Sequence, residues 1–458
     1  MFRIERDSIG EKQVPREAYY GVQSLRAFEN FKITGRCVHP ELIRAIAEIK
    51  RACAMANSSV GALDKKIADA IISACDEICE GKLCDQFIVD AVQGGAGTSM
   101  NMNANEVVSN RAIELLGREK GDYSVVHPND HANCGQSTND VFPTSGKIAA
   151  IRLFKRAKEA LSGLRSSLLA KAEEFSDVVK MGRTEMQDAV PLTLGAEFAA
   201  FAAAIARDIK RFDTAIAELS VVNMGGTAVG TGITADPAYI KKIVPTLASV
   251  TGLSLTQADD LIDGTQNLDC FVIASGIVKA CAVNLSKMAN DLRLMSSGPR
   301  TGFGEINLPP KQNGSSIMPG KINPVIPEVM SQISYNIIGN DTTITLSAEA
   351  GQLELNANEP IIFYCLFESI ETLTQGVLAM KNECVDGISA NREKCADDVA
   401  KSMSIVTALC PYIGYTKSAE LAKRAMREGK RIREVVLEEG IFDEEKLDEI
   451  LNPFNMIQ

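Results

Sequence analysis

Apolar residues recur every three or four positions along long stretches of this chain, which is the spacing of a buried helix face. Five stretches carry the pattern: 146–176, 194–222, 267–295, and two that begin near Pro327 and Glu359. The third is followed by Gly298 and Pro299, which together are a strong helix stop signal. The pattern therefore predicts that long helices dominate from about residue 143 to residue 390.

Several of these predicted helices are apolar on more than one side. The stretch 194–222 reads LGAEFAAFAAAIARDIKRFDTAIAELSVV, in which many small residues accompany the larger apolar ones. A lone helix of this kind leaves apolar surface exposed, whereas a bundle shared between subunits covers it. We therefore expect an obligate homo-oligomer that is built on the long helices.

The character of the predicted helices changes twice along the chain, so we expect three domains. Residues 1–137 form a mixed, mostly helical cap domain, with shorter helices near 40–59 and 64–80. Residues 138–391 form the central bundle of long helices. Residues 392–458 carry short, charged helices such as EEKLDEI and form a small helical C-terminal domain.

Composition narrows the class of protein. The chain has 458 residues, of which 45% are hydrophobic and 23% charged, as in ordinary globular proteins. Its formal net charge of −11 would repel the negatively charged phosphate backbone of a nucleic acid, so we expect no nucleic-acid partner. The most apolar stretches, 198–206 and 270–283, are too short to span a bilayer or include Lys279, so we expect no membrane association.

The cysteine and histidine spacings give no metal site. The 12 cysteines include the close set Cys75, Cys79 and Cys84, which lacks the paired spacing of a zinc module. We interpret them as reduced thiols of a cytoplasmic protein, because the opening MFRIERDSIGEKQVP has no apolar signal-peptide core. The HPNDH motif at 127–131 has the histidine spacing of a zinc helix, but its internal proline argues against that interpretation.

Four stretches are dense in hydroxyl and amide side chains. They are GGAGTSMNMNANE from Gly94, CGQSTNDVFPT from Cys134, MGRTEMQDAVP from Met181 and GSSIMPGKINP from Gly314. Such groups donate hydrogen bonds to carboxylate oxygens, and backbone N–H groups at a glycine-rich turn converge on anions. Helix capping and ordinary surface turns are the alternative interpretations of any one stretch. Four stretches in one chain favour a site that handles negative charge.

These stretches, in this order, resemble the fumarase and aspartase superfamily over nearly the whole chain, and GSSIMPGKINP is similar to its signature. The members of that superfamily eliminate ammonia, water or another group and leave fumarate or a fumarate-like product. The resemblance implies a mainly α, three-domain subunit with a central five-helix bundle. It further implies a homotetramer with a twenty-helix core, whose active sites are each built from three subunits.

The resemblance is strongest to the branch that removes ammonia from aspartate. The segments that carry it are GGAGTS at 94–99, NDLRLMSSGPR at 290–300, IGNDTT at 338–343 and AEAGQLELN at 348–356. HPNDH at 127–131 and the MPGK of the signature occur in the hydratase branch as well. The resemblance implies reversible elimination of ammonia from L-aspartate through an enediolate intermediate, with a small amino-acid or dicarboxylate substrate. It implies no organic cofactor, with divalent metal at most a non-essential activator.

Carried over residue by residue, the resemblance makes Ser315 the general base, with Lys321 as its catalytic partner. Lys321, Asn323 and the N–H groups of the loop after Ser315 would meet the charge of the intermediate. The remaining substrate-binding positions that the resemblance implies are Thr98, Ser99, Ser137, Thr138, Asn139, Thr184, Glu185 and Ser316.

A serine base needs activation, and no histidine of this sequence obviously supplies it. A mobile loop that closes over the substrate, excludes water and brings backbone donors and Lys321 to the serine oxygen meets that need. Gly314 and Gly320 are then hinge or close-approach positions. His131 is interpreted as a structural histidine.

Glu185 departs from the family pattern, which has histidine or glutamine at this place in GRTEMQDAVP. An ionised carboxylate there would repel a substrate carboxylate. Glu185 is therefore protonated, or turned toward a base such as Arg183, or matched by a donor or cation on a different substrate. Two alternative functions stay open: a lyase of this fold with another substrate, including fumarate hydration, and a non-catalytic structural protein of the superfamily.

Overall fold

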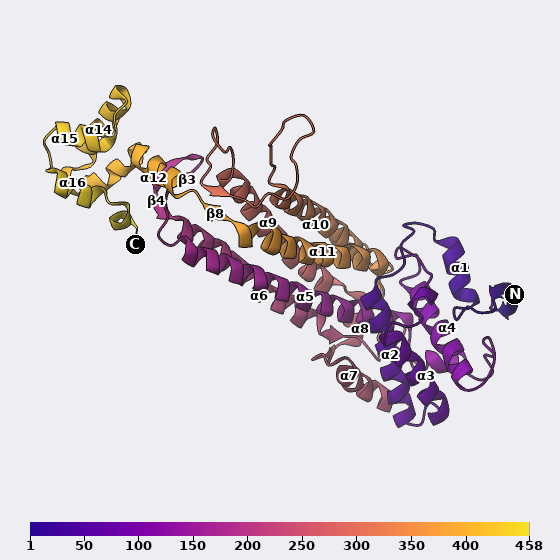
Figure 1. Ribbon diagram of the computed structural model, residues 1–458. Helices are drawn as coiled ribbons and strands as arrows, with labels where there is room; N and C mark the ends of the chain where they lie inside the picture. The colour runs from indigo at the N-terminus through magenta and orange to yellow at the C-terminus, as the bar shows by residue number, and fades with distance from the viewer. Residues whose placement is uncertain (458) are drawn as a thin grey trace. The chain divides into compact units, whose positions relative to one another are not determined.

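Helices make up most of the computed structural model, which describes residues 1–457 (Figure 1). The helices are α1 Val22–Asn30, α2 Pro40–Ser59, α3 Lys65–Cys79, α4 Thr98–Leu115, α5 Thr138–Glu174, α6 Leu194–Leu219, α7 Pro237–Thr251, α8 Leu261–Gln266, α9 Asp269–Met295, α10 Val325–Glu349, α11 Glu359–Ala379, α12 Arg392–Lys401, α13 Cys410–Ile413, α14 Tyr415–Glu428, α15 Ile432–Glu438 and α16 Glu444–Leu451. The mainly α fold class that the sequence predicts is confirmed.

The five long helices that the apolar pattern predicts are all present, as α5, α6, α9, α10 and α11. The helices expected near 40–59 and 64–80 are α2 and α3. Helix α9 ends at Met295, where the predicted stop signal begins. Helix α5 begins earlier than its periodic stretch, because the Ser137 hydroxyl accepts a hydrogen bond from the Asn139 N–H at 3.2 Å and caps the helix.

The long helices lie side by side (Figure 1), and each has segments in both of the compact units into which the chain divides. The first unit comprises 1–158, 210–280 and 335–372, and the second comprises the remaining residues. In the first unit, Phe154 of α5 meets Phe212 of α6 edge to face at 5.1 Å between ring centroids. Such a contact between neighbouring long helices is typical of a helical bundle.

The same helices also pack together elsewhere. In the first unit, Ser275 of α9 donates a hydrogen bond to Asp341 of α10 at 2.8 Å. In the second unit, Asn284 of α9 donates to Asp208 of α6 at 3.0 and 2.9 Å. A methyl group added at Gly376 of α11 would lie 2.8 Å from the Ile333 side chain of α10. Because the five helices contact one another in both units, they form the predicted five-helix bundle.

The domain boundaries at 137 and 391 stay predictions. Each of the two compact units consists of three separate segments of the chain, and every long helix contributes residues to both units. The C-terminal residues have an apolar core of their own, to which the β-strand residue Met181 is added. Its buried side chains after residue 391 are Val399, Ile405, Leu409, Leu421, Ala425, Ile432, Val435, Val436, Leu447 and Ile450.

Short two-stranded sheets join the helices, and the sequence analysis did not foresee them. The strands pair as β1 Phe2–Arg6 with β2 Glu11–Pro15, β3 Val179–Thr184 with β4 Gln187–Thr193, β5 Val221–Val222 with β6 Thr256–Gln257, and β7 Ile306–Asn307 with β8 Ser389–Ala390. Only the third pair is parallel. The β3–β4 hairpin matters for function, because its turn carries two predicted site residues.

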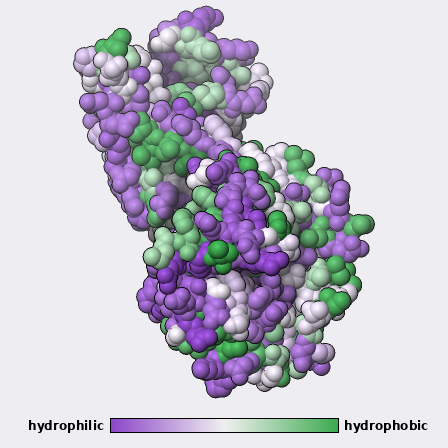
Figure 2. Space-filling view, turned by 90° about the vertical axis from the view of Figure 1, so that its right-hand side faces the viewer, coloured by the Kyte–Doolittle hydropathy of each residue, from purple (hydrophilic) through white to green (hydrophobic). Residues whose placement is uncertain are grey.

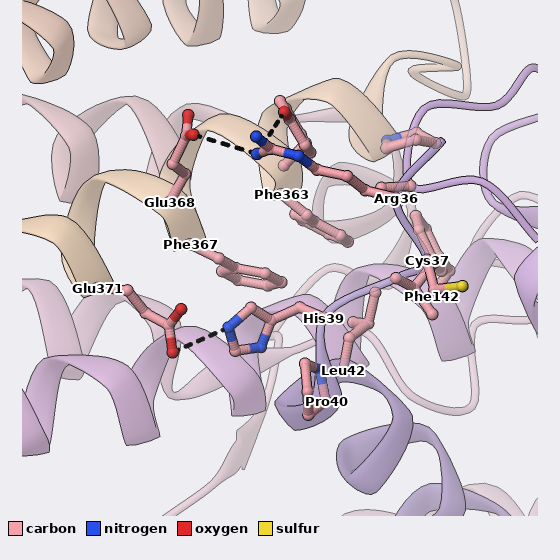
Figure 3. A pocket seen from close by; sticks show the side chains of 14 residues that line it. Arg36, Cys37, His39, Pro40, Leu42, Phe142, Phe363, Phe367, Glu368 and Glu371 are labelled. Atoms are coloured by element: carbon pink, nitrogen blue, oxygen red, sulfur yellow. Dashed lines mark hydrogen bonds and ion pairs between the residues drawn. The ribbon is translucent and has the colours of Figure 1, made fainter. Parts of the chain in front are cut away.

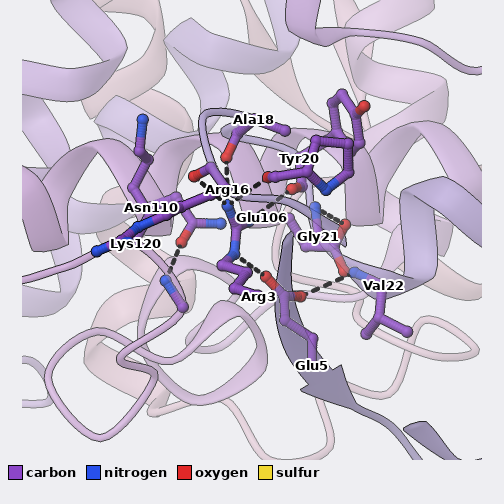
Figure 4. Close-up of polar contacts among 12 residues, drawn as sticks. Arg3, Glu5, Arg16, Ala18, Tyr20, Gly21, Val22, Glu106, Asn110 and Lys120 are labelled. Carbon is purple, nitrogen blue, oxygen red and sulfur yellow. Dashed lines mark hydrogen bonds and ion pairs between the residues drawn. The ribbon is translucent and has the colours of Figure 1, made fainter. Parts of the chain in front are cut away.

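Two buried glutamates hold the N-terminal segment in the first unit (Figure 4). Glu106 of α4 accepts hydrogen bonds from the backbone N–H groups of Gly21 at 2.8 Å and Ser24 at 3.1 Å. Glu5 accepts from the Val22 N–H at 2.8 Å and pairs with Arg3 at 2.7 Å. Burial raises the pKa of Glu106 to about 6. The start of α1 is therefore fixed to α4 by carboxylates that occupy its free N–H groups.

Apolar side chains remain exposed on the long helices. Tyr335 and Leu346 of α10 are 61% and 63% exposed, and Val283 of α9 is 50% exposed. Figure 2 shows apolar residues interrupting the polar surface on the face that it presents. Two helical spans, Asp269–Met295 and Glu359–Gly387, are long and apolar enough to cross a membrane by length and composition, as core helices of globular proteins also are. The first contains the stretch 270–283, for which no membrane span was expected because it includes Lys279.

Candidate functional site

The GGAGTS loop presents the start of α4 without a side-chain cap. Gly95, Ala96 and Gly97 have φ angles of 88°, 53° and 83°, a left-handed run that turns the chain sharply into the helix. A methyl group at Gly97 would lie 2.2 Å from the Phe142 ring, so only glycine fits. Thr98 is then the first helical residue and is exposed. The helix N-terminus with its hydroxyl is suited to an anion.

The CGQSTND loop brings three more predicted residues to the start of α5. Ser137 acts as the helix cap, so the capping interpretation is correct for this residue. Thr138 accepts a hydrogen bond from the Asn101 amide of α4 at 3.1 Å, which ties the two loops together. The Asn139 amide donates to the Ala228 carbonyl at 2.7 Å. Thr98, Ser99 and the 137–139 segment thus belong to one connected region of the first unit.

Thr184 and Glu185 lie at the tip of the β3–β4 hairpin in the second unit. Thr184 pairs with Gln187, and the two residues between them, Glu185 and Met186, have φ angles of 52° and 67°. This is the backbone of a two-residue type I′ turn, which non-glycine residues adopt at a cost. Both Thr184 and Glu185 are exposed. The chain by itself therefore gives Glu185 no water-poor pocket.

Arg183 does not serve as a partner for Glu185. Its guanidinium pairs with the buried Glu305 and lies 4.3 Å from the centroid of the Phe303 ring. Glu305 also pairs with Lys180 at 2.8 Å. This buried charge cluster fixes the base of the hairpin and leaves its tip free. Of the explanations for Glu185, rotation toward Arg183 is therefore not what the structure shows.

The GSSIMPGKINP loop is closed at its base and built around Ser315. The Gly314 N–H donates to the Lys321 carbonyl at 2.8 Å, and the Asn323 amide donates to the Gly314 carbonyl at 2.8 Å. Inside this closure, the Ser315 hydroxyl oxygen accepts hydrogen bonds from the N–H groups of Ile317 at 3.2 Å and Met318 at 2.9 Å. Donors aimed at this oxygen favour its ionised form.

The rest of the loop is open. Ile317 is 81% exposed, and Ser316 and Lys321 are exposed as well. Asn323 is half-buried, and its amide donates a hydrogen bond to the Gly314 carbonyl. A cavity of about 710 Å³ in the second unit is lined by Lys321 and Asn323 together with Arg293 and Glu328. The loop N–H groups after Ser315 were expected to face the charge of the substrate. In this structure, those of Ile317 and Met318 donate hydrogen bonds to the Ser315 oxygen.

The predicted residues are thus divided between several places within the described chain. Thr184 and Glu185 line another cavity of the second unit, of about 530 Å³. A third cavity, of about 220 Å³ in the first unit, is lined by aromatic residues such as Phe363 and Phe367 and by the His39–Glu371 pair (Figure 3). None of the predicted site residues lines that aromatic cavity.

The two histidines of the HPNDH motif make structural contacts. The His131 ring nitrogen Nδ1 accepts a hydrogen bond from the His127 N–H at 2.9 Å, and burial lowers the pKa of His131. His127 caps the short helical turn that follows it. All 12 cysteines are free. Within residues 1–457, no group of three or more His, Cys, Asp or Glu side chains is placed to hold a metal ion.

Sequence reasoning missed the buried polar side chains that support the loops. Asn101 connects α4 to Thr138, and Lys50 of α2 donates to Asn133 and to Gln136 of the CGQSTND loop. The run MNMNAN is rich in amides, but its sequence does not indicate which amide faces inward. Lys50 lies in an otherwise ordinary amphipathic stretch, and a lysine on the apolar face of that stretch was the available signal.

The long-helix bundle carries several loops rich in hydroxyl and amide groups that can donate hydrogen bonds to a carboxylate, and comparison with known families identifies the class of protein. A model described as "Lyase" matches residues 10–339, and one described as "Fumarase C C-terminus" matches residues 405–458. The chain therefore belongs to the fumarase and aspartase superfamily of lyases. Curated relatives named aspartate ammonia-lyase match nearly the full length. The protein from Bacillus sp is 52% identical, covering 99% of this chain and 97% of its own.

More distant relatives and solved structures agree with this assignment. The aspartate ammonia-lyase of Escherichia coli is 47% identical over 99% of this chain and 96% of its own. A Brucella melitensis structure described as fumarate lyase:delta crystallin bound to cobalt has a TM-score of 0.98 at 48% identity, covering 100% and 99% of the two chains. A class II fumarase from Schistosoma mansoni has a TM-score of 0.96 at 35% identity, with the same coverage.

Proposed function

We propose that this protein is an aspartate ammonia-lyase, a carbon–nitrogen lyase that converts L-aspartate reversibly to fumarate and ammonia. The observation that carries the proposal is the closed loop in which the Ser315 oxygen receives two backbone N–H groups at 3.2 and 2.9 Å. A serine oxygen held in this way is prepared to carry negative charge, as a base that attacks a weak carbon acid must.

In the reaction, Ser315 takes the proton from the carbon next to the β-carboxylate of the substrate. The electron pair of that C–H bond moves into the carboxylate, which becomes a doubly charged enediolate. The pair then returns to form the carbon–carbon double bond as the bond to the amino group breaks, and fumarate and ammonia leave. Lys321, which is exposed beside the loop, supplies positive charge to the intermediate.

The hydroxyls of Thr98, Ser137, Thr138 and Thr184 bind the two substrate carboxylates, with Ser99, Ser316 and Asn323 beside them, and Asn139 lies next to the amino group. Because exposed apolar residues remain on α9 and α10, we propose that four chains assemble through their long helices. Each active site then takes residues from three chains. We further propose a cytoplasmic enzyme that needs no organic cofactor, with divalent metal at most a non-essential activator.

The choice of aspartate over other substrates is supported by the relatives. Those named aspartate ammonia-lyase are 47% to 52% identical to this chain, whereas the class II fumarase is 35% identical. The second candidate, a lyase of a different amino acid, is favoured by one observation: an exposed carboxylate, Glu185, at the hairpin tip.

One set of assays separates these functions. The purified protein is incubated with L-aspartate, and then with fumarate in the presence and absence of ammonium, while the absorbance of fumarate is followed. An aspartate ammonia-lyase forms fumarate from aspartate and consumes fumarate only when ammonium is present. Consumption of fumarate without ammonium indicates a hydratase. Inactivity in every assay would refute the proposal, and other amino acids would then be screened.

A further inference from the structure

Lys50 of α2 is a buried lysine without an ion pair among the described residues. Its exposed fraction is 0%, and its ammonium donates hydrogen bonds to the Asn133 and Gln136 side-chain oxygens, both at 2.8 Å. Burial lowers the pKa of Lys50 to about 8. A buried ammonium that meets only neutral oxygens reduces stability relative to an apolar side chain of similar size. Such a residue suggests a role other than folding.

The ammonium holds the turn that leads into α5. Gln136 in turn donates through its amide to the carbonyls of Ala132 and Cys134, both at 3.2 Å. Asn133 donates to the Gln136 carbonyl at 3.1 Å. The segment from Ala132 to Gln136 is therefore folded around the Lys50 charge, and the next residues along the chain are Ser137, Thr138 and Asn139.

The same network reaches α4. The Asn133 side-chain oxygen also accepts hydrogen bonds from the Asn101 and Asn105 amides, both at 3.2 Å. The Asn101 amide donates to the Thr138 hydroxyl at 3.1 Å as well. The network therefore links α4, whose first residue is Thr98, to the start of α5.

Two oxygen acceptors in this network are unused. The side-chain oxygens of Asn101 and Asn105 are buried and have no hydrogen-bond partner. Asn133 shares one oxygen among three donors, of which Lys50 carries the only full charge. A cluster with unused acceptors in a buried setting stabilises a cation. The Lys50 ammonium binds side chains of the segment that leads into α5, whose N-terminal N–H groups already favour anions.

We infer that Lys50 is a positioning residue for substrate binding. Its buried ammonium fixes the 137–139 turn against α4 and adds positive potential at the place where a substrate carboxylate binds. The inference rests on the proposed function, because it takes the substrate to be a dicarboxylate held at Thr98 and the 137–139 turn. Lys50 itself touches no reacting atom.

The groups that face Lys50 define how its charge depends on pH. They are Asp140 of α5, Cys53 of α2 and Cys75 of α3. Burial raises the pKa of Cys53 to about 12 and that of Cys75 above its usual range, so both thiols stay neutral. Burial raises the pKa of Asp140 to about 6, so Asp140 is ionised above neutral pH. Deprotonation of Lys50 near pH 8 therefore removes the one positive charge of this cluster.

The experiment compares Lys50→Met with a matched control, Lys147→Met. Lys147 is also buried, at 6% exposure, but it donates to the Val221 carbonyl outside the network. The readouts are KM and kcat for aspartate, the Kd of succinate, which is a dicarboxylate without a reactive amino group, and the melting temperature. We expect Lys50→Met to raise KM and Kd by about tenfold or more, with a smaller change in kcat and an unchanged or higher melting temperature.

Three results would overturn the inference. KM and Kd within about twofold of the parent would show that the Lys50 charge is not used, and so would equal changes in the Lys147→Met control. If Lys50→Met does not fold, the unaltered protein is tested by calorimetry with succinate from pH 7 to pH 9.5. The Kd should then rise with a midpoint near pH 8, and a flat profile would contradict the role of Lys50. A parent protein that neither binds succinate nor acts on aspartate would overturn the proposed function itself.

Discussion

At the scale of single residues, the proposed chemistry depends on Ser315. Its hydroxyl accepts two hydrogen bonds from its own loop, and no imidazole among residues 1–457 of the same chain is hydrogen-bonded to it. Ser315→Ala should leave folding and assembly intact, because the side chain is half-buried in a loop that is closed by backbone contacts. We expect the rate of fumarate formation to fall by at least about a hundredfold, the usual contribution of a general base.

Steady-state kinetics measure the rate of the Ser315→Ala variant, and size-exclusion chromatography checks its folding and assembly. Turnover within about tenfold of the parent would remove Ser315 from this role.

Glu185 tests the fit between site and substrate. It is exposed at the hairpin tip, and Arg183 is bound to Glu305 rather than to it. If the substrate is aspartate, an ionised carboxylate here repels it, so Glu185→Gln should keep or raise aspartate deamination, most clearly at higher pH. The measurement is kcat/KM for aspartate from pH 6 to pH 9 in both proteins. A loss of about a hundredfold in the variant would instead make Glu185 a required partner of the substrate, and would favour an amino acid with a donor or cation at that end.

At the scale of elements, the Ser315 loop depends on the close approach of its two ends. A methyl group at Gly314 would lie 2.6 Å from the Lys321 carbonyl and 2.8 Å from the Asn323 nitrogen, so Gly314→Ala must force the base of the loop apart. Gly320 has a φ of 80° but no atom within 4 Å of the added methyl group, so Gly320→Ala costs only backbone strain of about 1 to 2 kcal/mol.

The two glycine variants should therefore separate loop closure from loop strain. We expect kcat to fall by at least about tenfold in Gly314→Ala and by clearly less in Gly320→Ala, with melting temperatures close to that of the parent. Equal losses in the two variants would mean that backbone strain alone, and not the approach of Gly314 to Lys321 and Asn323, controls the loop.

The comparison of sequence with structure is also clearest at this scale. The bundle was predictable because each long helix shows its apolar periodicity locally, and α9 carries its own stop signal. The β3–β4 hairpin was not predictable, since its turn residues Glu185 and Met186 are not the glycine or asparagine that mark such turns. The loops were identified by composition and family resemblance. Their contacts were not, because the pairing of Asn101 with Thr138 joins residues far apart in the sequence and depends on packing.

At the scale of the whole molecule, the predicted site residues fall in two compact units of the chain. Thr98 belongs to the first unit and Ser315 to the second. If each active site takes these residues from different chains, mixing Ser315→Ala protein with Thr98→Ala protein should restore activity after subunit exchange. In a random equal mixture, about one quarter of the sites would receive both intact residues. Activity assays with hybrid tetramers confirmed by native mass spectrometry give the result. Hybrids without any recovered activity would place both residues of a site in one chain.

If chains assemble through the apolar residues that stay exposed on α9 and α10, as proposed, activity depends on the concentration of the protein. In the proposed tetramer, neighbouring chains would cover Tyr335, Leu346 and Val283, and dilution would favour separated chains by mass action. A separated chain cannot complete a site that needs its neighbours. Specific activity should therefore decline at low protein concentration and recover on reconcentration. In a cell, output would then rise more steeply than copy number at low expression and in proportion to it once assembly is complete.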